Sequence, residues 1–181
     1  FRDSRRSNAG RFEMQRLPAD IGTPVDEIDT PALIVDLDAF ERALSPRTRA
    51  LIINTPHNPT GTVMTAKDMQ QLEKIVHNRD IFILSDEVYE HIIFDGLAHQ
   101  SVLCYPKLAE RSFVVFSFGK TVHATGWKTG YCVAPENLMA EFRRVHQYMV
   151  FSANTPLQYA LASYLSEPST YNSIPAFYQR K

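Results

Sequence analysis

Residues 50–61 read Ala-Leu-Ile-Ile-Asn-Thr-Pro-His-Asn-Pro-Thr-Gly, an apolar run that passes directly into a polar segment with two prolines and a glycine. A short, continuous apolar run is typical of a strand that is buried on both faces of a parallel sheet. The prolines and the glycine indicate that the strand ends in a turn. Residues 50–53 are therefore the first clear strand of the chain.

The same pattern recurs downstream, with helices expected between the strands. Further apolar strands are expected at residues 81–84, 113–116 and 131–133. A helix should begin at Thr65, whose hydroxyl can cap it together with Asp68, and another at Thr155-Pro156. Strands that alternate with helices predict an α/β fold with three layers, in which a mostly parallel sheet is joined by right-handed crossovers.

Two of the expected helices have a clear apolar stripe. In the helix after Thr65 the stripe consists of Met69, Leu72, Ile75 and Val76. In the helix over residues 136–150 it consists of Leu138, Phe142, Val145 and Met149. Such stripes are typical of helices that pack one face on a core. Tyr148 and Phe151, near the end of the second helix, are candidates for the core or an interface.

Composition excludes some classes of function and leaves others open. The 181 residues include 19 basic and 20 acidic ones. This balance gives no strong electrostatic field that would attract nucleic acid or an anionic membrane. No apolar run is long enough to span a bilayer, and the first residues lack the apolar core of a secretory signal. Cys104 and Cys132 lack the paired spacing of a zinc site, which favours buried, reduced thiols and a cytoplasmic location.

Two regions of different character divide the chain. Residues 1–43 are predicted to be an irregular N-terminal arm, solvated or clasping another subunit, because arginines and helix breakers dominate their first part. Residues 44–181 contain all the clear strands and helices.

Polar clusters follow three of the expected strands. They occupy residues 54–61, 86–89 and 117–120. Because the carboxyl ends of parallel strands meet at one edge of a sheet, we expect these clusters to form one site.

The side chains of these clusters, with one nearby cation, are the parts needed to hold pyridoxal 5′-phosphate. They are Lys120, Asp86, Tyr89, Asn58, Ser117 and Lys128. An amine can bind the cofactor aldehyde, a carboxylate can keep the ring nitrogen protonated, and a hydroxyl and a cation suit the phosphate. Taken singly, Asp86 is better explained as a strand-end residue and Asn58-Pro59 as part of a turn. Glu87 is expected to be structural, and the histidines show no metal-binding spacing.

Three segments together resemble the class I and II aminotransferases, which are fold-type I pyridoxal phosphate enzymes. They are the turn Asn58-Pro59-Thr60-Gly61, the strand end Ser85-Asp86-Glu87-Val88-Tyr89, and Ser117-Phe118-Gly119-Lys120 with Gly126-Trp127-Lys128. Segments 54–59, 90–91 and 126–131 are most similar to the methionine and kynurenine aminotransferase subgroup. That subgroup is similar to this chain in having lysine at position 128, where the family usually has arginine. The resemblance covers about residues 44–181.

The resemblance implies a role for each site residue. Lys120 would be the Schiff-base lysine and proton shuttle, and Asp86 would pair with the pyridine nitrogen. Tyr89 and Asn58 would contact the phenolic oxygen. Ser117 and Lys128 would bind the phosphate. The resemblance also implies an amino acid and a 2-oxo acid as substrates and a homodimer as the assembly.

The chain departs from the family in length. Family subunits are more than twice as long, and two functional pieces are not found here. One is an upstream glycine-containing turn for the phosphate, with an aromatic residue that stacks on the ring. The other is a small domain whose arginine binds the substrate carboxylate. Residues 44–181 are therefore expected to be a partial large domain, from a truncated or fused gene product or from part of a longer chain.

Residues 27–41 show a second, weaker resemblance, to the start of fold-type III enzymes of the D-threonine aldolase group. The lysine motif of that group does not follow. Residues 35–44 could equally be the short helix that precedes the strand at residue 50 in aminotransferases.

Three functions remain open from the sequence. The first is transamination of methionine or an aromatic amino acid through Lys120. The second is an inactive fragment that keeps the sheet and serves as a folding or interaction module. The third is a lyase that cleaves carbon–sulfur bonds with the same lysine and carboxylate.

Overall fold

A computed structural model describes residues 35–180, with the side chain of Thr170 excepted. Of the predicted arm over residues 1–43, residues 1–34 lie outside the described residues. A short helix, α1 (Leu37–Ala43), follows directly, with Asp36 as its N-cap. Its position agrees with a helix that precedes the first strand, which was one of the two interpretations of residues 35–44.

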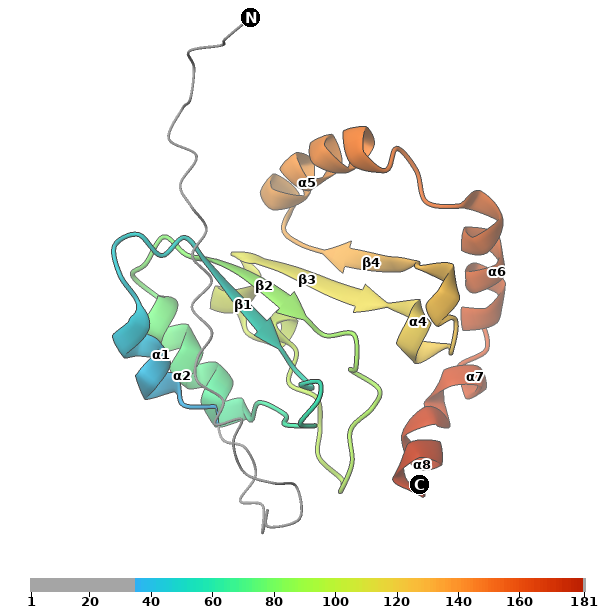
Figure 1. Ribbon diagram of the computed structural model, residues 1–181, viewed down its shortest axis with the longest axis horizontal. Helices are drawn as coiled ribbons and strands as arrows, with labels where there is room; N and C mark the ends of the chain where they lie inside the picture. The colour runs from blue at the N-terminus through green and yellow to red at the C-terminus, as the bar shows by residue number, and fades with distance from the viewer. Residues whose placement is uncertain (1–34, 181) are drawn as a thin grey trace, which may run out of the picture. The chain divides into compact units, whose positions relative to one another are not determined.

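The four strands form one sheet in the order β1-β2-β3-β4 (Figure 1). They are β1 (Ala50–Asn54), β2 (Phe82–Asp86), β3 (Ser112–Ser117) and β4 (Gly130–Val133). The first three strands are parallel, and β4 runs antiparallel to β3. The prediction of a mostly parallel sheet is therefore confirmed, and each predicted strand is present within two residues of its expected limits.

Helices and short 3₁₀ turns make up the connections. After α1 they are α2 (Ala66–Val76), η2 (Val102–Cys104), α3 (Pro106–Ala109), α4 (Phe118–Thr121), η3 (Thr125–Trp127), α5 (Glu136–Met149), α6 (Thr155–Leu165), α7 (Ser169–Asn172) and α8 (Ile174–Gln179). In the described residues no helix is both long and apolar enough to cross a membrane.

The helix starts follow from local sequence. Thr65 and Asp68 form the predicted capping box of α2, in which each side chain accepts from the other residue's backbone N–H. The expected cap of α6 at Thr155 is wrong by one residue. Asn154 caps this helix and accepts from Leu157 N at 3.1 Å, while Thr155 is its first residue. Asn154 is the N-cap here because its side-chain carbonyl oxygen reaches the free N–H groups of the first turn.

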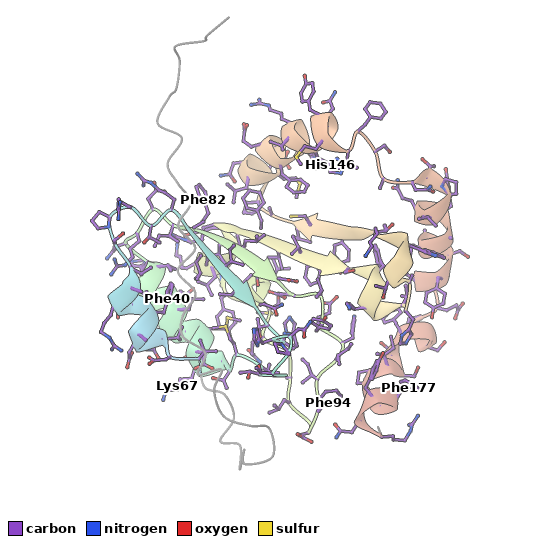
Figure 2. All side chains as sticks on the ribbon, in the orientation of Figure 1. Phe40, Lys67, Phe82, Phe94, His146 and Phe177 are labelled. Carbon is purple, nitrogen blue, oxygen red and sulfur yellow. The ribbon has the colours of Figure 1, made fainter. Side chains whose placement is uncertain are left out.

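The core lies between α1, α2 and one face of the sheet. The whole predicted stripe of α2 is buried: Met69, Leu72, Ile75 and Val76. It belongs to one cluster with Ile83 of β2 and Val114 of β3, and Phe40 of α1 completes that side (Figure 2). This packing fixes β1, β2 and β3 relative to one another.

The stripe of α5 is not buried, in contrast to that of α2. None of its residues is buried, and Val145 and Met149 are 58% and 77% exposed. Phe142 reaches Phe113 of β3, with 6.2 Å between the ring centres. Tyr148 and Phe151, the candidates for the core or an interface, are exposed as well.

The two cysteines were expected to be buried, and this expectation is wrong. Both are free thiols, but Cys104 is exposed at the end of η2 and Cys132 is half-buried in β4. Cys104 is exposed because η2 turns its last residue away from the core that Val102 enters.

Candidate active site

Asn54, the last residue of β1, connects the first two polar clusters. Its side-chain oxygen accepts from Asn58 N at 3.0 Å, and its side-chain nitrogen donates to Asp86 O at 3.1 Å. The register also places Asn54 directly beside Asp86. One amide thus holds the turn after β1 against the end of β2. Sequence reasoning gave Asn54 no role, although an amide that ends an apolar strand at this edge was a usable signal.

Three of the predicted residues come together from three strand ends. Asn58 Nδ2 donates to Tyr89 Oη at 3.0 Å. Lys120 Nζ lies 5.3 Å from the centre of the Tyr89 ring, within range of a cation–π contact. In the described residues Lys120 forms no ion pair. Its amine is therefore held close to an aromatic face without being neutralised by a carboxylate.

Asp86 ends β2 with a half-buried carboxylate. This carboxylate accepts one hydrogen bond, from Val88 N at 3.3 Å. The backbone of Asp86 is fixed on both sides, because its carbonyl accepts from Thr55 N and it pairs with Val115 of β3. A rigid backbone and a carboxylate with free acceptor capacity suit a cationic partner.

Ser117 and Lys120 lie at the junction of β3 and α4. Ser117 Oγ accepts from Gly119 N at 3.1 Å, and Thr125 Oγ1 donates to the Gly119 carbonyl at 2.9 Å. A Cβ on Gly119 would lie only 3.0 Å from Thr125 Cα, so glycine permits this close packing. The junction therefore holds Lys120 on a short, tightly tied turn.

Lys128 lies in the left-handed region, with φ 52°, where η3 ends. Its side chain is exposed. The strand pair brings Gly130 beside Ser117, and Phe118 N donates to Thr129 O at 3.2 Å, so the backbone at Lys128 returns toward the β3 end. The neighbouring Trp127 is 47% exposed.

Glu87 has a completely buried side chain, with an exposed fraction of 0%. Its Oε1 accepts from Ser85 Oγ at 2.8 Å and from Val102 N at 3.1 Å, and its Oε2 contacts His99 Nε2 at 2.7 Å. Burial alone would raise the pKa of this carboxyl, but these hydrogen bonds, with a further one from Ser101, lower the pKa below its ordinary value of 4.5. Glu87 is thus structural, as expected, and ionised at neutral pH.

Glu90 and Tyr131 form a second contact behind the site. Burial, followed by the charge and hydrogen bond of Glu90, raises the pKa of Tyr131 to about 12. Burial also raises the pKa of the Glu90 carboxyl, and the charge of Glu87 adds to this shift. The Tyr131 ring stacks on Phe116 at 4.7 Å between centres. This contact connects the segment after Tyr89 to β4.

The sequence matches one family over most of its length. The model of the family described as aminotransferase class I and II matches residues 22–180. The chain belongs to this family. The resemblance found from the sequence motifs is therefore confirmed.

Relatives within the aminotransferase family place the chain more closely. Methionine aminotransferase of Escherichia coli is 52% identical over 155 residues, which are 85% of this chain and 40% of that protein. A kynurenine–oxoglutarate transaminase of Dictyostelium discoideum is 35% identical over 152 residues, 81% of this chain and 35% of that protein. The chain thus spans between 32% and 40% of the length of these and similar curated relatives.

Solved structures of aminotransferases share the fold. A crystal structure from Escherichia coli, reported with a methionine aminotransferase function, has a TM-score of 0.80 and 52% identity over 83% of this chain and 40% of that chain. Thermus thermophilus aspartate aminotransferase with maleate has a TM-score of 0.73 and 28% identity, covering 81% of this chain and 38% of that chain. The prediction of the large-domain fold is confirmed.

The residues present fit pyridoxal phosphate by their chemistry. The Lys120 amine, which forms no ion pair with any residue from 35 to 180, lies beside Tyr89, which is already hydrogen-bonded to Asn58. The Asp86 carboxylate has free acceptor capacity. In the described part of the chain, no group of three or more histidine, cysteine or acidic side chains could hold a metal ion.

Proposed function

We propose that the protein is a pyridoxal phosphate enzyme that transfers the amino group of methionine, or of an aromatic or kynurenine-like amino acid, to a 2-oxo acid. The observation behind this proposal is the meeting of Lys120, Tyr89 and Asn58 from three separate strand ends. Membership of the family and the 52% identity to a methionine aminotransferase support it.

Each predicted residue then has a task that its geometry suits. Pyridoxal phosphate supplies a ring that accepts the electrons left on the substrate Cα when its proton is removed. Lys120 Nζ would hold the cofactor, and the same amine would accept the Cα proton of the substrate. The Asp86 carboxylate stabilises the protonated ring nitrogen.

The remaining residues orient the cofactor. The Asn58–Tyr89 hydrogen bond holds the phenol in place, so that Tyr89 and Asn58 can both donate toward the ring oxygen. Ser117 Oγ accepts from Gly119 N, which orients the hydroxyl so that its own O–H can donate to a phosphate oxygen. Lys128 adds positive charge at the same end of β3.

Binding of the cofactor tests the proposal directly. The purified chain is titrated with pyridoxal phosphate, and the absorbance band of the lysine-bound cofactor is recorded. We expect Lys120→Ala to abolish the band. Lys67→Ala is the matched control, because Lys67 is exposed in the first turn of α2 and belongs to none of the three strand-end clusters (Figure 2). Absence of a band in the wild-type chain contradicts the proposal.

The products distinguish the remaining alternatives. Transamination of methionine yields its 2-oxo acid and leaves the amino group on the cofactor. A lyase that cleaves carbon–sulfur bonds yields pyruvate and a thiol from a cysteine conjugate. An inactive fragment yields neither, even where the cofactor binds. The homodimer and the cytoplasmic location remain predictions from the sequence.

A further inference from the structure

The segment that contains Tyr89 is a long loop between β2 and η2. Residues 88–98 form neither helix nor strand, and Phe94 marks the far end of the loop (Figure 2). Both ends of the loop meet at one buried side chain. Glu87 stands at its start, and His99 and Val102, 12 and 15 residues further on, donate to the Glu87 carboxylate.

The Glu87 carboxylate is the most strongly bound part of this loop. It is completely buried and accepts from Ser85 Oγ, Val102 N and His99 Nε2. The His99 side chain is 14% exposed, and its Nδ1 is buried without a hydrogen-bond partner in the described residues. Within the part of the chain that the structure describes, Nε2 is therefore the ring nitrogen through which His99 hydrogen-bonds. Removing a donor from a buried carboxylate of this kind is costly, because the carboxylate is left without compensation.

The pair lies directly behind the candidate site. Glu87 follows Asp86 in the chain, and its backbone N–H donates to Val115 O of β3 at 3.0 Å. The Glu87 carbonyl accepts from Glu90 N at 3.0 Å, which fixes the turn that contains Tyr89. Closing the loop at Glu87 thus limits where the Tyr89 ring can lie relative to Lys120.

We propose that Glu87 and His99 are positioning residues: their buried contact closes the loop over residues 88–98 and so holds Tyr89 against Asn58 and Lys120. The effect on the cofactor rests on the proposed function. The closing of the loop does not, because it is a property of the chain without cofactor.

Two variants of His99 separate positioning from general stability. His99→Ala removes the donor to Glu87. His99→Gln keeps an N–H donor at a similar reach, so it should restore the contact. Ser112→Ala is the control, because it removes another completely buried hydrogen bond, from Ser112 Oγ to Leu108 O at 2.7 Å, at the opposite end of the sheet.

Amide hydrogen exchange of the chain without cofactor is the first measurement. In His99→Ala, exchange over residues 88–98 should rise at least about tenfold more than in Ser112→Ala, after correction for global stability. His99→Gln should return most of the protection. Equal exchange in the two alanine variants, or no rescue by His99→Gln, overturns the proposal.

Affinity for pyridoxal phosphate is the second measurement, read from the absorbance band. His99→Ala should weaken binding severalfold, while Ser112→Ala should not. Cofactor binding that is equally strong in both variants overturns the positioning role. If the wild-type chain shows no cofactor band, the proposed function is contradicted. The exchange experiment still tests the loop contact, because it is done without cofactor. If His99→Ala does not fold, Ser85→Ala takes its place, because it removes another donor to Glu87. A uniform rise in amide exchange across the chain, rather than a rise over residues 88–98, would then overturn the proposal.

Discussion

Helices α2 and α5 have similar apolar stripes, but the stripe of α2 is buried and that of α5 is not. The stripe of α2 is buried against β2, β3 and α1, and Met69 and Leu72 are 0% exposed. No residue of α5 is buried, and Met149 is 77% exposed. An amphipathic pattern therefore specifies which face of a helix can be buried, while burial itself depends on the surface that the rest of the fold presents.

Helix α2 has its partners within the described chain. The apolar side chains of α2 pack against strand residues on one face of the sheet, and this packing buries apolar surface of both elements. For α5, the ring contact of Phe142 with Phe113 joins the helix to the sheet, but none of its residues is buried. The packed half of the molecule should accordingly dominate its stability, and the half that contains α5 should contribute little.

The largest expected difference is between two methionines. Met69→Ala should lower the free energy of unfolding by about 2–5 kcal/mol, because it leaves a cavity in the core. Met149→Ala is the matched change on α5 and should alter the same quantity by less than about 0.5 kcal/mol. Urea denaturation of both variants is the measurement. Equal losses would show that α5 is buried in solution.

The next effect is a loss of stability in acid. Because the pKa of Glu87 is lowered in the folded state, its ionisation stabilises the fold fully above pH 4.5, and this stabilisation is lost as the pH falls through the lowered value. Each unit of lowering corresponds to about 1.4 kcal/mol. Stability measured against pH should fall less steeply in Glu87→Gln than in the wild type over that range. Parallel curves would contradict the contribution of Glu87.

A smaller effect is expected from the helix caps. Thr65→Ala removes the capping box of α2 and should cost about 1 kcal/mol. Helix α5 has Pro135 as its N-cap residue, which provides no side-chain hydrogen bond. Pro135→Ala should therefore cost less than Thr65→Ala. Thermal denaturation of the two variants is the measurement, and a larger loss in Pro135→Ala would reverse the comparison.

The smallest effect concerns an ion pair on α5. Arg144 Nη1 lies 2.8 Å from Glu141 Oε1, but both side chains are mostly exposed. Glu141→Gln should change stability by about 0.5 kcal/mol or less, since solvent and salt screen such pairs. The change should vanish at high salt in denaturation experiments. A larger change would indicate that this surface is covered in solution.

Much of the fold and part of the site could be predicted from local sequence. Apolar runs located all four strands, and Thr65 with Asp68 located the start of α2. Asn58, Tyr89 and Lys120 were selected as one site because they follow strand ends, and the structure brings them together. Whether they bind a cofactor stays a prediction.

Other features could not be predicted because they depend on distant contacts. Asn54 joins two clusters only because β1 and β2 are neighbours in this register. The contact of His99 with Glu87 closes a loop whose path no local pattern describes. The exposure of Cys104 likewise follows from how η2 meets the core.

The sequence by itself determined the four strands, the start of α2 and the family, because each depends on residues close together in the chain or on motifs in a fixed order. Only the tertiary structure decided which apolar stripe is buried and how Asn54 and the Glu87–His99 contact join distant segments. Burial and hydrogen bonding join residues far apart in sequence, so their outcome follows from the packed sheet rather than from any single segment.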